Sequence, residues 1–174
     1  MSNTNLELER KFLVKPEYVN EIKRNSIQRQ YIKQTYLSFD PELRVRKIIN
    51  AVDNTIKYTL TAKRNKEIGK IEKEFEIKLS TYLDLYKNKE SEDLYKTRYI
   101  IPLAHCLSEE SMNGLVGEMD VYRDFDIVVI EVEFPSILAM MSFIPPNWFG
   151  KEVTFDSDFG NKTLIKRLSK METK

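Results

Sequence analysis

The sequence has 174 residues, of which 41% are hydrophobic and 32% are charged, and this balance excludes a disordered chain and predicts one globular domain over residues 1–174. Its 28 lysines and arginines nearly cancel its 27 aspartates and glutamates, so the net charge of +1 excludes a general attraction to nucleic acid or to a membrane. A single cysteine, Cys106, excludes an internal disulfide, and the sequence shows neither a signal-peptide core nor a long apolar run; we therefore expect a cytoplasmic protein.

Eight segments alternate apolar and polar side chains and predict β-strands, because successive side chains of a strand point to opposite faces. In chain order these segments are 6–14, 31–39, 43–49, 54–64, 70–79, 95–101, 115–122 and 127–134. The first of them, LELERKFLV, places Glu7, Glu9 and Lys11 on one face and apolar side chains on the other. The same alternation returns in every later segment, which predicts a sheet with one charged face.

Helices are expected in the gaps between these strands. Start signals and apolar stripes at helical spacing predict helices at 16–27, 82–89, 137–143 and 162–171, with Pro16, Ser80 or Thr81, Ser136 and Asn161 at their starts. Residues 104–114 are expected to form a long loop. His105 and Cys106 lie in it as neighbours, and we do not interpret them as a catalytic pair, since adjacent residues of an extended chain point apart.

The charged faces carry glutamate, arginine and lysine doublets where solvent-facing strands usually mix in serine, threonine, asparagine and glutamine. An open sheet would turn these charges to solvent, and no function would follow. If the strands close instead, the charges line a channel, and the fold is α+β, an eight-stranded antiparallel closed barrel with a charged lumen and helices on its outside. The acids are Glu7, Glu9, Glu72, Glu74, Glu76, Glu118, Asp120, Glu131 and Glu133, and the bases are Lys11, Arg44, Arg46, Lys57, Lys63, Lys78, Lys96 and Arg98.

A lumen with so many charges is not expected to serve stability, because paired ions often fail to recover the free energy lost when they leave water. It is better explained by a ligand. The bases suit a polyanion, and the carboxylates suit a hard divalent cation. A triphosphate bound with Mg²⁺ or Mn²⁺ satisfies both.

The motif ELERK (7–11) resembles the ExExK signature of the CYTH domains, also called triphosphate tunnel metalloenzymes. The resemblance continues in order through QTYL (34–37), ELRVR (42–46), LTAK (60–63), EFE (74–76), KTRY (96–99), EMDV (118–121), EVEF (131–134), FIPPNWFGKEVT (143–154) and NKTL (161–164). It therefore covers most of the chain, and the long FIPPNWFGKEVT segment is its most specific part. The resemblance implies a tunnel barrel, dependence on a divalent metal and a small-molecule triphosphate substrate.

The resemblance also implies roles for individual residues. The expected substrate cradle is Lys11, Arg44, Arg46, Lys63, Lys96 and Arg98, and the expected ligands of Mg²⁺ or Mn²⁺ are Glu7, Glu9 and Glu133. Lys11, Glu76 and Asp120 are the expected catalytic residues, with Glu76 or Asp120 positioning the attacking water or, equally well, holding a base in place. Glu74, Glu118 and Glu131 are the remaining acids of the tunnel.

Two departures from the family pattern lower the local positive charge. Glu72 stands where similar proteins have a base, and Asp158 and Phe159 stand where an Arg-Tyr pair is usual. We expect them to affect substrate size and affinity more than the fold.

Within the family the same cradle serves several activities. The sequence most resembles the small bacterial enzymes that hydrolyse inorganic tripolyphosphate to pyrophosphate and phosphate. Alternatives are hydrolysis of thiamine or nucleoside triphosphates, a class IV-type adenylate cyclase, and a module that binds polyphosphate or nucleotide without turnover. The sequence leaves open whether the chain forms a homodimer.

Overall fold

The computed structural model describes residues 8–65, 70–103 and 114–171. Its strands are β1 (Glu9–Val14), β2 (Gln28–Phe39), β3 (Glu42–Asn50), β4 (Ile56–Asn65), β5 (Lys70–Glu76), β6 (Leu94–Pro102), β7 (Val116–Tyr122), β8 (Val128–Glu133) and β9 (Phe149–Glu152). Its helices are α1 (Val19–Arg24), α2 (Leu79–Tyr86), α3 (Ile137–Ser142) and α4 (Asn161–Met171), with short 3-10 turns at Pro16–Tyr18 and Ser157–Phe159. The fold is therefore α+β, as the sequence predicts.

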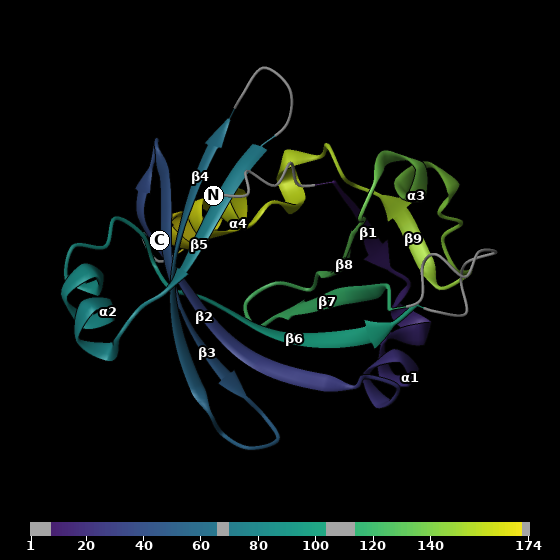
Figure 1. The fold of residues 1–174 in the computed structure, drawn as a ribbon, viewed down its shortest axis with the longest axis horizontal. Coiled ribbons are helices and arrows are strands. Elements are labelled where there is room, and N and C mark those ends of the chain that lie inside the picture. The colour runs from purple at the N-terminus through teal and green to yellow at the C-terminus, as the bar shows by residue number, and fades with distance from the viewer. Residues whose placement is uncertain (1–7, 66–69, 104–113, 172–174) are drawn as a thin grey trace.

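All nine strands belong to one antiparallel sheet in the order β5-β4-β3-β2-β6-β7-β8-β1-β9. The eight predicted strands are all present, and the ninth, β9, was missed. It adds to the free edge of β1. In the described part of the chain no ladder joins β5 to β9, so hydrogen bonds do not close the sheet and the predicted closed barrel is not confirmed. The sheet is strongly curved, and β4 and β5 stand across an opening from β1 and β8 (Figure 1).

One side of the sheet rests on an apolar core. Phe12, Met119, Ile130 and Val132 lie on that side of β1, β7 and β8, and they pack with Ala139 of α3 and other buried groups. The alternation read from the sequence explains this face, because the neighbouring residues of the same strands carry the charges. As expected, the Ser136 hydroxyl begins α3 by accepting a hydrogen bond from the Ala139 amide at 3.1 Å.

Helix α2 starts earlier than predicted. It begins at Leu79, so Ser80 and Thr81 lie inside it, and Lys78 at its N-cap makes no side-chain capping bond. Tyr82 of this helix packs over Tyr58 of β4, with ring centroids 4.8 Å apart. The helix therefore covers the outer face of β4, as the sequence suggests for the helices in general.

Helix α4 is the exception to the prediction that the helices pack on the outside. Its buried residues Leu164, Ile165 and Leu168 contact Tyr36 and Tyr122, with Leu94 and Val129 in the same cluster. On their strands, these four residues share the face of the charged positions, so α4 fills one end of the inner side of the sheet. Burial of each of its apolar side chains contributes about 1.5–3 kcal/mol, and the Tyr122 hydroxyl donates a hydrogen bond to Asn161 Oδ1 at 2.7 Å.

None of the helices in the described ranges is both long enough and apolar enough to span a membrane.

Candidate functional site: a charged channel

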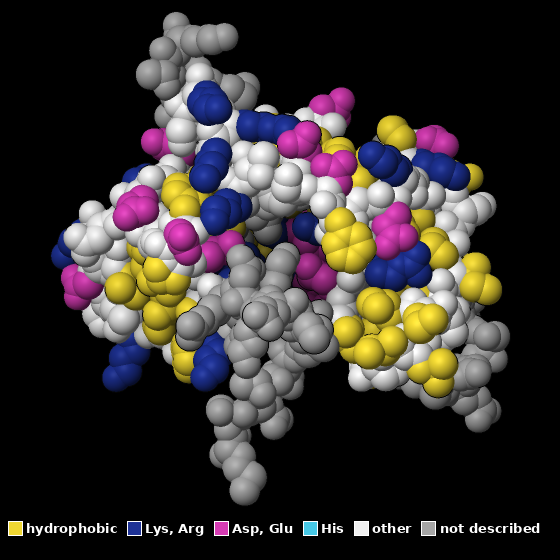
Figure 2. All heavy atoms as spheres, turned by 90° about the horizontal axis from the view of Figure 1, so that it is seen from above, with side chains coloured by type: hydrophobic (Ala, Val, Ile, Leu, Met, Phe, Trp, Pro, Cys, Tyr) yellow, Lys and Arg dark blue, Asp and Glu magenta, His cyan; other side chains and the backbone are white. Residues whose placement is uncertain are grey.

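Most of the described charged residues of the predicted lumen face the hollow on the inner side of the curved sheet (Figure 2). Figure 2 looks onto the top of the molecule and shows acidic and basic side chains deep between the two halves of the sheet. The strand register explains why these acids and bases lie together. Arg98 lies opposite Asp120 on the β6 and β7 ladder, and Lys11 lies opposite Glu131 on the β1 and β8 ladder. Pairs that share a rung on the same face meet side by side.

Asp120 is the centre of the deepest cluster. The residue is fully buried, and its carboxylate accepts hydrogen bonds from Lys96 Nζ at 2.5 Å, from Arg98 Nε at 2.8 Å and from Arg98 Nη2 at 2.7 Å. Burial opposes the charged form of this acid, but Arg98 and Lys96 outweigh burial and lower the pKa of Asp120. Both carboxylate oxygens are thus occupied in fixing two cations.

A second set of acids holds the other side of Arg98. Glu131 pairs with Lys11 at 2.6 Å and lies 3.4 Å from Arg98 Nη2, while Glu118 pairs with Arg98 Nη1. Burial works against charge on Glu131, yet Lys11 and Arg98 lower its pKa below the usual range. The expected tunnel bases Lys11, Lys96 and Arg98 therefore share one buried network with Asp120 and Glu131.

The remaining bases of the predicted cradle form a second network on β3, β4 and β5. Arg44 Nη2 lies 3.0 Å from Glu72 Oε1, and Lys63 pairs with the same carboxylate. Arg46 Nη1 lies 3.0 Å from Glu74 Oε2. Glu72, the first departure from the family pattern, is thus placed between two of the predicted cations and reduces their combined charge locally.

Two cations of the channel have lowered pKa values although each is paired with an acid. Burial, with the positive charges of Arg44 and Arg98, lowers the pKa of Arg46 to about 10. Burial and the positive charge of Arg98 lower the pKa of Lys96 to about 8, although Asp120 opposes this shift. The interior therefore favours an added anion, which would stabilise the protonated forms of both groups.

At the end of the inner face away from α4, two carboxylates lie beside each other. Glu9 lies directly opposite Glu133 on the β1 and β8 ladder, and neither makes an ion pair with a described residue. Partial desolvation raises the pKa of Glu133, and Glu118, Glu9, Glu131 and Glu72 raise it further. The strong curvature of the sheet brings its β5 end toward β8 (Figure 1), which is why Glu72 of β5 also acts on Glu133.

The unopposed carboxylates suit a divalent cation. Oxygen ligands are those that Mg²⁺ and Mn²⁺ prefer, and like charges facing each other across a ladder are destabilising until a cation joins them. No group of three acidic, histidine or cysteine side chains within the described ranges comes together as a metal site. Glu7, the third predicted ligand, lies outside the described residues. Among the described residues, Glu9 and Glu133 are therefore the predicted ligands whose positions suit a divalent cation.

Several predicted residues lie away from the buried networks. The side chain of Glu76 is 68% exposed and lies 3.3 Å from Lys57, and Lys78 is exposed at the start of α2. Asp158, the second departure, pairs with Arg167 of α4 at 2.9 Å, with both side chains well exposed. The structure therefore places Asp158 on the surface and not among the channel bases.

The inner wall also contains uncharged residues for which the sequence predicted no role in the site. The Gln34 side-chain oxygen accepts a hydrogen bond from Arg46 Nε at 2.9 Å, and the Thr61 hydroxyl donates to Glu74 at 2.9 Å. Tyr36 donates to Glu42 at 3.3 Å, and burial raises the pKa of this tyrosine to about 12. Their positions in the strand alternation were the available signal, since each shares the face of Arg44 and Arg46.

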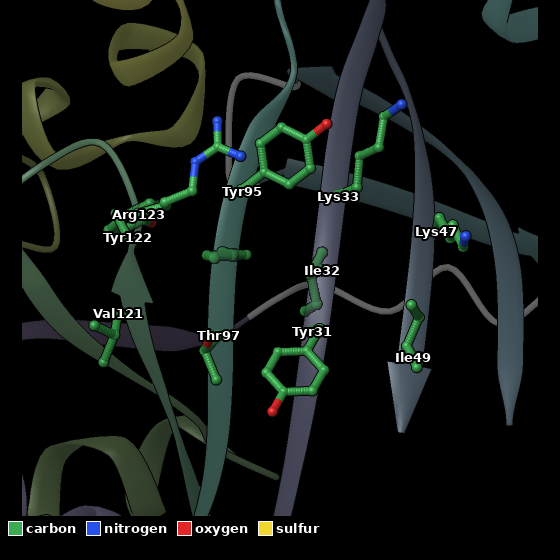
Figure 3. Close-up of a pocket in the computed structure, with 11 residues that line it drawn as sticks. Tyr31, Ile32, Lys33, Lys47, Ile49, Tyr95, Thr97, Val121, Tyr122 and Arg123 are labelled. Atoms are coloured by element: carbon green, nitrogen blue, oxygen red, sulfur yellow. The ribbon is translucent and has the colours of Figure 1, made fainter. Parts of the chain in front are cut away.

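A separate hollow of about 550 Å³ lies on the outer face of β2, β3, β6 and β7, between Tyr31, Lys47, Tyr95 and Arg123 (Figure 3). Lys33, at its rim, lies 3.0 Å from Asp93, and Arg123 contacts Asp124 at 3.0 Å. Two of its cations are therefore already paired with acids on this outer face.

Comparison with known proteins agrees with the character of this site, although no protein-family model matches the chain. An inorganic triphosphatase of Nitrosomonas europaea is 32% identical over 160 residues, which cover 91% of this chain and 95% of that protein. An inorganic triphosphatase of Acetivibrio thermocellus is 27% identical over 165 residues, covering 92% and 93%. A crystal structure of an inorganic triphosphatase superposes with a TM-score of 0.57 at 29% identity, covering 94% of this chain and 97% of that one.

Proposed function

Because the chain belongs to the CYTH family of triphosphate tunnel metalloenzymes, which includes these inorganic triphosphatases, we propose that it hydrolyses inorganic tripolyphosphate to pyrophosphate and phosphate. The observation that carries this proposal is the distribution of charge along one inner face. Cations with lowered pKa values lie deep in the channel, and an unopposed pair of carboxylates lies at its other end. A polyanion with a bound divalent ion complements both parts.

The cradle binds phosphate oxygens through two kinds of cation. Arg44, Arg46 and Arg98 offer planar forks that can hold two oxygens each, whereas Lys11, Lys63 and Lys96 act as point charges. The acids between them fix the cations before substrate arrives, so little reorganisation is needed on binding. Asp120 serves the reaction in this way, by holding Lys96 and Arg98 in place.

Glu9 and Glu133, with Glu7 as the third predicted ligand, would hold Mg²⁺ or Mn²⁺. When bound, such an ion neutralises phosphate charge and orients the substrate.

Hydrolysis of the phosphoric anhydride bond needs few groups beyond this cradle and the metal ligands. Water attacks the terminal phosphorus in line, a new phosphorus-oxygen bond forms, and the bond to the bridging oxygen breaks to release pyrophosphate. The arginines and lysines stabilise the charge that develops on the leaving pyrophosphate, and no covalent nucleophile is required. The role of Glu76 in positioning the water stays a prediction. Its side chain is mostly exposed and pairs with Lys57, away from the buried cations.

The test is a product analysis with purified protein. Tripolyphosphate, ATP and thiamine triphosphate are each incubated with Mg²⁺ or Mn²⁺, and phosphate, pyrophosphate and cyclic AMP are measured. We expect phosphate and pyrophosphate from tripolyphosphate at the highest kcat/KM. Cyclic AMP from ATP would show a cyclase instead, and binding without any product would show a non-catalytic module; either result would overturn the proposal.

A further inference from the structure

The inner wall contains a group of buried hydrogen-bond donors without partners among the described residues. They are Gln34 Nε2, Thr59 Oγ1 and Arg44 Nε. Gln34 and Thr59 are 0% exposed. Folded proteins satisfy nearly all buried polar groups, so several unsatisfied donors at one place indicate an acceptor that the protein itself does not supply. The fourth such atom, the Tyr82 hydroxyl, lies apart from them on α2.

The sheet register places Gln34 and Thr59 on either side of Arg46. Gln34 of β2 lies opposite Arg46 of β3, and Arg46 lies opposite Thr59 of β4. Arg46 Nε donates to the Gln34 oxygen, which fixes the amide group and leaves its NH₂ end unpartnered. One rung of the inner wall therefore presents, in order, an amide donor, a guanidinium and a hydroxyl.

An anionic oxygen is the acceptor that suits this rung. Arg46 sits among other cations in a buried wall, so a further positive side chain on either side of it would add repulsion. Neutral donors bind an oxygen without adding charge. They also keep their hydrogen-bonding capacity at any pH at which the protein is folded.

We propose that Gln34 and Thr59 donate hydrogen bonds to phosphate oxygens of the substrate, on either side of the oxygens held by Arg46. This inference rests on the proposed function for the identity of the substrate. Two uncharged residues would then bind phosphate together with the lysines and arginines of the cradle.

Thr59→Val is the sharpest variant, because valine keeps the shape of threonine and removes only the hydroxyl. Thr61→Val is its matched control. Thr61 lies two residues after Thr59 on the same face of β4, and its hydroxyl already donates a hydrogen bond to Glu74. Gln34→Met removes the amide. Tripolyphosphate affinity is measured by calorimetry with EDTA present, so that binding is read without turnover, and the Tm of each free protein is measured beside it.

We expect Thr59→Val and Gln34→Met each to weaken tripolyphosphate binding about tenfold, as loss of a hydrogen bond to a charged group does. Thr61→Val should change affinity less than threefold. In the free protein the order reverses: Thr59→Val should leave the Tm unchanged or higher, because no hydrogen bond is lost, whereas Thr61→Val should lower it.

Affinities within twofold of the wild-type value for both Thr59→Val and Gln34→Met would overturn the inference, whatever the wild-type protein hydrolyses. A wild-type protein that binds tripolyphosphate but releases no product would instead overturn the proposed function. In that case weakened binding by the two variants would still support the inference. The two failures are therefore separable, and Thr59→Val keeps the test valid if Gln34→Met does not fold.

Discussion

Asn in place of Asp120 perturbs the channel at its most buried ion pair. Asp120 accepts three hydrogen bonds from Lys96 and Arg98, and its side chain is 1% exposed. Removing one partner of a buried ion pair costs about 3–5 kcal/mol, since the other partner keeps its desolvation cost. Arg98 retains Glu118 and Glu131, so the lower end of this range applies.

For a chain of this length each kcal/mol shifts the Tm by about 2–4 °C, so Asp120→Asn should lower the Tm by about 6–12 °C. The lost charge also leaves the cations short of a counter-ion. Tripolyphosphate should therefore raise the Tm of the variant by more than it raises that of the wild type. Turnover should fall, because Lys96 and Arg98 are no longer held in place.

Differential scanning fluorimetry with and without tripolyphosphate measures both effects. Asp124→Asn is the control, since Asp124 pairs with Arg123 on the surface, where such pairs contribute little, and its Tm should stay within about 2 °C. The reasoning is refuted if Asp120→Asn melts as the control does, or if the ligand stabilises the variant less than the wild type.

Three further predictions concern the metal, the cradle and pH. Glu9→Gln should weaken Mn²⁺ binding at least tenfold with the circular dichroism spectrum unchanged, and unaltered Mn²⁺ titrations would contradict the assigned ligand. Arg44→Ala should raise the KM for tripolyphosphate about tenfold or more with a smaller effect on kcat, because a guanidinium that grips phosphate is lost; equal KM values would remove Arg44 from the cradle. Lys96 has a pKa of about 8 and binds an anion only when protonated, so tripolyphosphate affinity should be constant well below pH 8 and fall above it. Calorimetry from pH 6 to 9.5 measures this, and Lys96→Met should lack the decline near pH 8; a decline that persists in that variant would assign it to another group.

Strand periodicity predicted most of the inner wall. Arg44, Arg98 and Asp120 could be placed on one face from alternation alone, because a residue's face in a strand depends only on its position. The pairing of Arg98 with Asp120 could not be predicted, since it depends on the register between β6 and β7. Alternation also places Thr59 on the face of Lys57 and Lys63, but no role could be predicted for it or for Gln34, because an uncharged residue on a polar strand face looks the same whether it meets water or a ligand.

One strand and the packing partner of one helix could not be predicted, for different reasons. Strand β9 has four residues, follows a Pro-Pro pair and contains Gly150, so neither its length nor its composition indicates a strand. Helix α4 was predicted correctly as amphipathic, but an apolar stripe shows that a helix buries one face and not which surface it meets. Its contact with Tyr36 and Tyr122 depends on the curvature of the whole sheet.

The position of α4 makes the two ends of the inner face chemically different. At one end Leu164, Ile165 and Leu168 pack against Tyr36 and Tyr122, and toward the other end Glu9 lies opposite Glu133. A polyanion lying along this face would therefore have apolar groups near one terminus and a carboxylate-bound cation near the other. The two ends of an otherwise symmetric ligand such as tripolyphosphate are then no longer equivalent, so the face imposes a direction on it.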